Sequence, residues 1–122
     1  PHAITESFTY KRPFAFTLCG IAFTNTTTWK DIYVSFLKYM VKNDSKLFLS
    51  FLNNEEFVSS KQKKDFSKDK KEVRFAVWIE EGIYAEVNYS AMHIARNIRK
   101  ILKLYNLSED KIQIYLRQDR DA

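Results

Sequence analysis

Two hydrophobic periods follow each other in residues 82–116, and their order constrains the fold more than any other feature of this chain. Apolar residues alternate with polar ones over 83–87, as in a strand with one buried face. They then recur every three or four residues in a helix that begins after Ser90, and they alternate again over 112–116. This β-α-β pattern predicts a domain that mixes helices and strands.

The first half of the chain shows the same two periods. Residues 13–24 alternate around Cys19-Gly20, which favours a β-hairpin. Thr28, followed by an acidic residue three positions later, is typical of a helix start, and Asp44 suits the start of a second, shorter helix. Both helices carry apolar residues at helical spacing.

A second hairpin is expected where residues 73–79 and 83–87 alternate around Gly82. The element order is therefore β-β-α-α-β-β-α-β. It predicts an α+β fold of two layers, with a mixed sheet of about five strands and helices mainly on one face.

A chain of 122 residues suits one core, so we predict that residues 1–122 form a single domain. The polar residues 1–12 and the charged residues 118–122 are expected to be partly ordered ends. Residues 59–72 carry six lysines and three acidic residues without an apolar period, which predicts a solvated lysine-rich loop.

The sequence lacks the residues that most catalytic and cofactor sites need. Two glycines cannot build a phosphate-binding loop, and one cysteine with two histidines falls short of a zinc site unless carboxylates help. A Cys19–His93 dyad and the Glu109-x-Lys111 spacing of many nuclease metal sites are weighed against ordinary surface and turn roles, which we favour. We therefore expect no enzymatic activity, no metal and no cofactor.

The lone cysteine also excludes an internal disulfide and fits a reducing compartment. No apolar run approaches the ~20 residues of a membrane span, and no signal peptide is recognisable. These features predict a cytoplasmic protein without a membrane partner.

The outward positions of the strands combine aromatic and basic residues, and a net charge of +5 permits a nucleic-acid partner or an acidic protein surface. Rings stack on unpaired bases while arginine meets phosphate, so such a face suits single-stranded DNA or RNA. The alternative is that the N-terminal segment, the 59–72 loop or a second copy of the chain covers these rings. The residues expected to share this face are Arg74, Trp78, Tyr84, Asn88, Tyr115 and Arg117.

The helix after Ser90 offers a second, purely basic surface. Its charged side carries Arg96, Arg99, Lys100 and Lys103, and together with the loop from Lys61 to Lys71 it could contact duplex phosphates. We single out Arg96 and Lys100 as candidate phosphate contacts on this helix. The alternative is an ordinary solvated helix face.

Four segments resemble, in order, a small uncharacterised bacterial and archaeal module. They are Phe14-Ala-Phe-Thr-Leu-Cys-Gly, Thr28-Trp-Lys-Asp-Ile-Tyr-Val, Asp65-Phe-Ser-Lys-Asp and Gly82-Ile-Tyr-Ala-Glu-Val-Asn-Tyr-Ser-Ala. The module is appended to longer proteins, some in restriction or phage-defence settings. The resemblance spans residues 13–117 and implies a non-catalytic accessory role, with no functional residue carried over.

Together these features predict a non-catalytic accessory module that binds nucleic acid in a bacterial defence or DNA-processing context. The alternative is a module for protein interaction or self-association as a homodimer.

Overall fold

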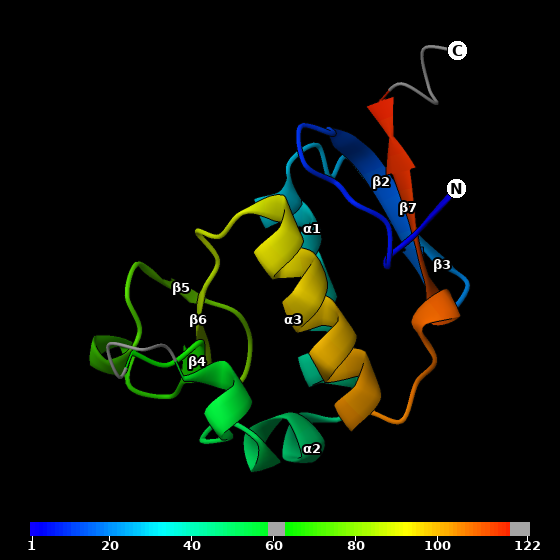
Figure 1. Ribbon diagram of the computed structural model, residues 1–122. Coiled ribbons are helices and arrows are strands. Elements are labelled where there is room, and N and C mark those ends of the chain that lie inside the picture. The colour runs from blue at the N-terminus through cyan, green and yellow to red at the C-terminus, as the bar shows by residue number, and fades with distance from the viewer. Residues whose placement is uncertain (59–62, 118–122) are drawn as a thin grey trace. The chain divides into compact units, whose positions relative to one another are not determined.

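The computed structural model describes residues 1–58 and 63–117 (Figure 1). In these ranges the fold is α+β, with three α-helices and seven strands in two antiparallel sheets. The chain divides into two compact units: unit 1 comprises Pro1–Phe36 and Tyr89–Ala122, and unit 2 comprises Leu37–Asn88. The predicted α+β class is confirmed. The prediction of one mixed sheet of about five strands is wrong, because the strands pair in two separate, wholly antiparallel sheets.

The sheet of unit 1 has the strand order β1-β7-β2-β3. Its strands are β1 (His2–Ala3), β2 (Pro13–Leu18), β3 (Ile21–Thr24) and β7 (Ile112–Leu116). The predicted hairpin is therefore present as β2 and β3. Its turn has φ 51° at Cys19 and 81° at Gly20, and two positive values in succession are what a two-residue type I′ turn requires.

The N-terminal segment contributes a strand and two core residues to unit 1. Part of residues 1–12 forms β1, which pairs with β7. Ile4 and Phe8 in the same segment are buried. Two apolar anchors are enough to dock a mostly polar segment, because each buried side chain contributes about 1.5–3 kcal/mol.

Two long helices contribute to unit 1, and both start at the predicted caps. The backbone N–H of Asp31 donates to Thr28 Oγ1 (3.0 Å) at the start of α1 (Trp29–Asn43), which continues into unit 2. The N–H of His93 donates to Ser90 Oγ (3.2 Å) at the start of α3 (Ala91–Leu104), and a 3₁₀ turn, η3 (Glu109–Lys111), leads into β7.

The core of unit 1 lies between the sheet and these helices, which are on one side of the sheet in Figure 1. Within it, Asn97 Nδ2 donates a fully buried hydrogen bond to Tyr33 Oη (3.1 Å), linking α3 to α1. The buried apolar residues include Phe16, Leu18, Ile32, Phe36, Ile94, Ile98, Ile101, Ile112 and Ile114.

Unit 2 contains a three-stranded sheet of order β4-β6-β5. Its elements are α2 (Ser45–Ser50), the 3₁₀ turns η1 (Glu55–Phe57) and η2 (Lys70–Glu72), and the strands β4 (Phe66–Ser67), β5 (Ala76–Trp78) and β6 (Tyr84–Glu86). The N–H of Leu47 donates to Asp44 Oδ1 (3.1 Å), so the predicted cap of α2 is confirmed.

Four phenylalanine rings form the core of unit 2. The ring of Phe66 lies 5.2 Å from both Phe48 and Phe57, and Phe51 lies 4.7 Å from Phe48. Phe66 is fully buried and part of β4, so the prediction of a solvated loop over residues 59–72 is wrong at the buried residues 65–67, whereas residues 63 and 68–71 are exposed. Residues 59–62 and 118–122 lie outside the described residues. No helix in the described ranges is long and apolar enough to cross a membrane.

Candidate nucleic-acid interface

The hairpin of β5 and β6 positions two aromatic side chains opposite each other. Trp78 pairs with Tyr84 in the antiparallel register, and cross-strand neighbours lie on the same face of a sheet. The turn closes through a hydrogen bond from Ile83 N–H to the Glu80 carbonyl (2.9 Å), with positive φ at Glu81 and Gly82. Half of the Trp78 surface is exposed, while Tyr84 is half-buried.

The next cross-strand pair on this face is Ala76 with Glu86, and Glu86 binds an arginine. Glu86 lies two residues after Tyr84, so its side chain is on the same face. Its carboxylate is buried and accepts from Arg74 Nε (2.9 Å) through one oxygen and from the Asn88 N–H (3.0 Å) through the other. The Arg74 side chain itself remains 57% exposed.

A third ring lies next to this arginine. The Arg74 guanidinium carbon is 5.3 Å from the centre of the Phe75 ring, which is within range for a cation–π contact. Phe75 has φ 49° and is 65% exposed. Arg74 and Phe75 directly precede β5, and Trp78 and Tyr84 pair within the β5–β6 hairpin; we call these four residues the aromatic platform.

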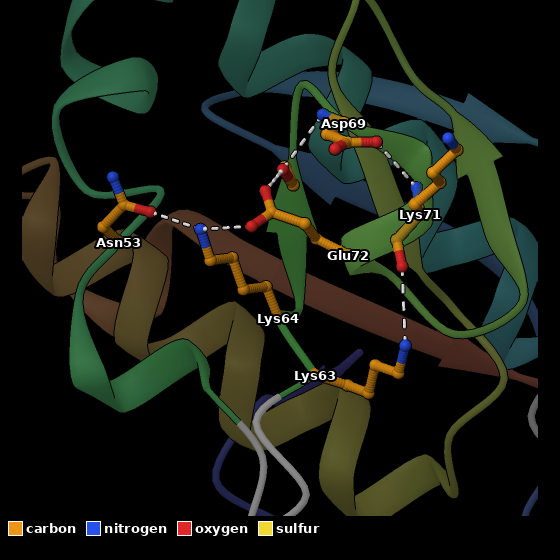
Figure 2. A network of polar contacts seen from close by, with 7 residues as sticks. Asn53, Lys63, Lys64, Asp69, Lys71 and Glu72 are labelled. Carbon is orange, nitrogen blue, oxygen red and sulfur yellow. Dashed lines mark hydrogen bonds and ion pairs between the residues drawn. The ribbon is translucent and has the colours of Figure 1, made fainter.

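The connection between β4 and β5 is held by a polar network centred on Glu72 (Figure 2). The Ser67 hydroxyl donates to Glu72 Oε1 (2.6 Å), and Lys64 Nζ lies 3.2 Å from Glu72 Oε2. The hydrogen bond from Ser67 and then that from Lys64 hold the pKa of Glu72 below its ordinary value of 4.5. Lys64 Nζ also donates to Asn53 Oδ1 (2.8 Å).

These contacts divide the lysines of this region into two sets. Lys64 is engaged in the network, and Lys63 Nζ donates to the Lys71 carbonyl (3.4 Å). Lys68, Lys70 and Lys71 are exposed on the connection that leads to Arg74. Three exposed lysines therefore precede the platform residues in the sequence.

The predicted common face of six residues is wrong, because the three of them that lie in strands belong to two sheets in different units. Trp78 and Tyr84 lie in β5 and β6, whereas Tyr115 lies in β7. The Tyr115 ring is 6.2 Å from the Phe14 ring. Arg117, which follows β7, donates through its N–H to the Arg12 carbonyl (2.8 Å) and through Nη2 to the Thr27 carbonyl (3.4 Å).

The candidates outside the platform differ in exposure. Asn88 is exposed and follows β6, where its N–H supports Glu86. On α3, Arg96 is exposed and Lys100 is half-buried. The neighbouring Arg99 Nε is 3.2 Å from Glu109 Oε1. The α3 stripe thus presents Arg96 as its most accessible candidate.

Two exposed aromatic residues were missed at the sequence level. Phe75 was assigned to the buried side of a regular strand, but its positive φ interrupts the alternation before β5 begins. Tyr10 is fully exposed with φ 64°, directly before Lys11 and Arg12. The Tyr-Lys-Arg triplet was a usable signal for an exposed residue, whereas nothing in the sequence around Phe75 marks the change in φ.

The residues weighed for catalysis are found in unit 1. Cys19 lines an open pocket together with Asp110 and Lys111, and its N–H donates to the Lys111 carbonyl (2.8 Å). The His93 ring stacks on Tyr89 at 3.8 Å. Among the described residues no group of three or more His, Cys, Asp or Glu could hold a metal ion.

Comparisons with known proteins give no relative from which a role could be carried over. No protein-family model, curated protein or solved structure matches this chain.

Proposed function

We propose that this chain is a non-catalytic accessory module that binds single-stranded nucleic acid through the aromatic platform. The observation that supports the proposal is that one hairpin segment carries two exposed rings, Phe75 and Trp78, and an arginine that contacts the Phe75 ring and is held by the buried Glu86. Unpaired bases stack on such rings with little dependence on sequence.

The chemistry of the platform favours a single strand over a duplex. In a duplex the faces of the bases are stacked on one another, so an exposed tryptophan has no partner ring. A single strand can place a base on Trp78 while a phosphate meets Arg74 or one of the exposed lysines of the β4–β5 connection. The resemblance to an accessory module supports a setting in bacterial defence or DNA processing.

Binding can be measured with short labelled DNA and RNA oligonucleotides by fluorescence anisotropy. Trp78→Ala should weaken binding by about 1–3 kcal/mol, the contribution of one stacked base. Arg96→Ala and Lys100→Ala on α3 are control variants, because they remove cations and leave the four platform residues unchanged. We expect Trp78→Ala to cost more than either control.

Trp78 also provides a direct optical signal. The chain has two tryptophans, and the other, Trp29, packs against Phe8 and donates through Nε1 to the Lys11 carbonyl. In a Trp29→Phe background, stacking of a base on Trp78 should quench the remaining fluorescence. Binding without quenching, or a larger loss in Arg96→Ala than in Trp78→Ala, would move the site to α3 and contradict the proposal.

A further inference from the structure

The edge strand β3 has backbone groups that point away from β2, the strand with which it pairs. The type I′ turn at Cys19-Gly20 joins Leu18 and Ile21, which are Cα partners in the register of β2 and β3. In a two-residue hairpin the residues that flank the turn form a hydrogen-bonded pair, and hydrogen-bonded pairs alternate along the ladder. The Phe16–Phe23 pair is therefore also of this kind.

The alternation leaves Ala22 and Thr24 with their N–H and C=O groups directed outward. Both residues are exposed, and β3 is at the edge of the sheet with no strand on its other side among the described residues. Ile21 at the end of this edge is 48% exposed. The Phe23 ring stacks on the ring of its cross-strand partner Phe16 at 4.6 Å.

The composition of this edge suits a second copy of the same chain. Between Arg12 and Lys30 there is no charged residue, although charged residues make up 29% of the sequence. Edge strands of monomeric proteins are usually protected by lysine, proline or a bulge, and β3 has none of these. In a two-fold pair centred on Phe23, residue 23 faces its own copy and residues 22 and 24 face each other, so like charges at these positions would repel, and the β3 edge carries none. The β3 edge also carries no charge that could attract an oppositely charged peptide of another sequence.

We propose that β3 pairs in antiparallel fashion with β3 of a second copy, on a two-fold axis that passes between the two Phe23 residues. Ala22 of each chain then forms a hydrogen-bonded pair with Thr24 of the other. The two pairs exchange about four hydrogen bonds, since each contributes two. The Phe23 rings meet as a non-hydrogen-bonded cross-strand pair, in which side chains approach most closely. The dimer joins the two sheets into one continuous sheet.

The register makes the proposal testable with paired charges. In Ala22→Lys/Thr24→Lys, like charges face each other across the axis. In Ala22→Lys/Thr24→Glu, the new lysine of each chain faces the new glutamate of the other. Thr5→Lys/Thr9→Lys, at two exposed positions of the N-terminal segment, adds the same charge as the first variant away from β3. The four proteins are compared by sedimentation equilibrium over a range of concentrations, in a reducing agent because Cys19 is exposed.

We expect the wild-type protein, the Lys/Glu variant and the Thr5/Thr9 variant to dimerise reversibly, and the Lys/Lys variant to stay monomeric. In the wild-type protein, the amide hydrogens of Ala22 and Thr24 should exchange more slowly at high than at low concentration. This second measurement needs no variant, so it tests the proposal even where a variant fails to fold. A wild-type monomer at every concentration, equal behaviour of the Lys/Lys and Lys/Glu variants, or concentration-independent exchange of both amides would each overturn it.

Discussion

The ion pair of Arg74 and Glu86 should be a measurable source of stability for unit 2. Glu86 is 2% exposed, and each of its carboxylate oxygens accepts one hydrogen bond. Arg74→Met retains most of the apolar stem but removes the guanidinium, so a buried carboxylate loses its cation. A hydrogen bond to a charged group contributes about 1.5–3 kcal/mol.

The size of the effect follows from the unequal burial of the two partners. Removing one member of a fully buried pair costs about 3–5 kcal/mol, but Arg74 is more than half exposed and its charge is partly screened. We therefore expect Arg74→Met to destabilise the protein by about 2 kcal/mol. For a chain of this length that lowers Tm by roughly 6–10 °C.

A double-mutant cycle with Glu86→Gln isolates this interaction. Glutamine has the shape of glutamate but no charge, so the loss of Arg74 should matter less beside it. Thermal melts of both single variants and the double variant should give a coupling energy of about 1–2 kcal/mol. Lys68→Met, which removes an exposed cation from the same region, should change stability by no more than about 0.5 kcal/mol. Additive effects of Arg74→Met and Glu86→Gln would refute the reasoning.

Two further changes test the surroundings of the platform. Ser67→Ala should raise the pKa of Glu72 toward 4.5, because it removes the main cause of its depression; NMR titration of the carboxyl carbon would show this. The stability linked to the lowered pKa of Glu72 is complete above pH 4.5 and is lost as pH falls through the pKa of the folded state. The Ser67→Ala variant should therefore lose less stability in acid than the wild-type protein. An unchanged pKa of Glu72 in this variant would contradict the network. Gly82→Ala should cost about 1–2 kcal/mol in thermal melts, because φ is +73° while no atom lies within 4 Å of the added carbon. An unchanged stability of Gly82→Ala would mean that the backbone of the turn relaxes to accommodate alanine, and would contradict this prediction.

Local signals in the sequence predicted much of unit 1. The helix starts at Thr28 and Ser90 and the hairpin turn at Cys19-Gly20 depend only on neighbouring residues, and all are found where they were predicted. Strand pairing depends on distant residues. Alternation over 73–79 and 112–116 shows that each segment has two faces, but it does not show that the two segments join different sheets.

The candidate site was predicted in part for the same reason. Trp78 and Tyr84 are neighbours across a hairpin, which sequence proximity can reveal, and they were correctly expected on one face. Tyr115 and Arg117 were assigned to that face only through the assumption of a single sheet. Phe75 was missed because a single positive φ at a non-glycine residue reverses the side on which its ring lies.

The division of unit 1 into two segments has a consequence for synthesis on the ribosome. Phe16 of β2 pairs with Ile114 of β7, so the two partners emerge 98 residues apart. At translation rates of roughly 5–20 residues per second, β2 waits about 5–20 seconds for its partner. The strands of unit 2 meet much sooner, since Trp78 and Tyr84 are six residues apart and Phe66 and Ala85 nineteen. During that interval the uncharged β2–β3 hairpin has both edges unpaired, which makes the nascent chain most vulnerable to aggregation before β7 is made.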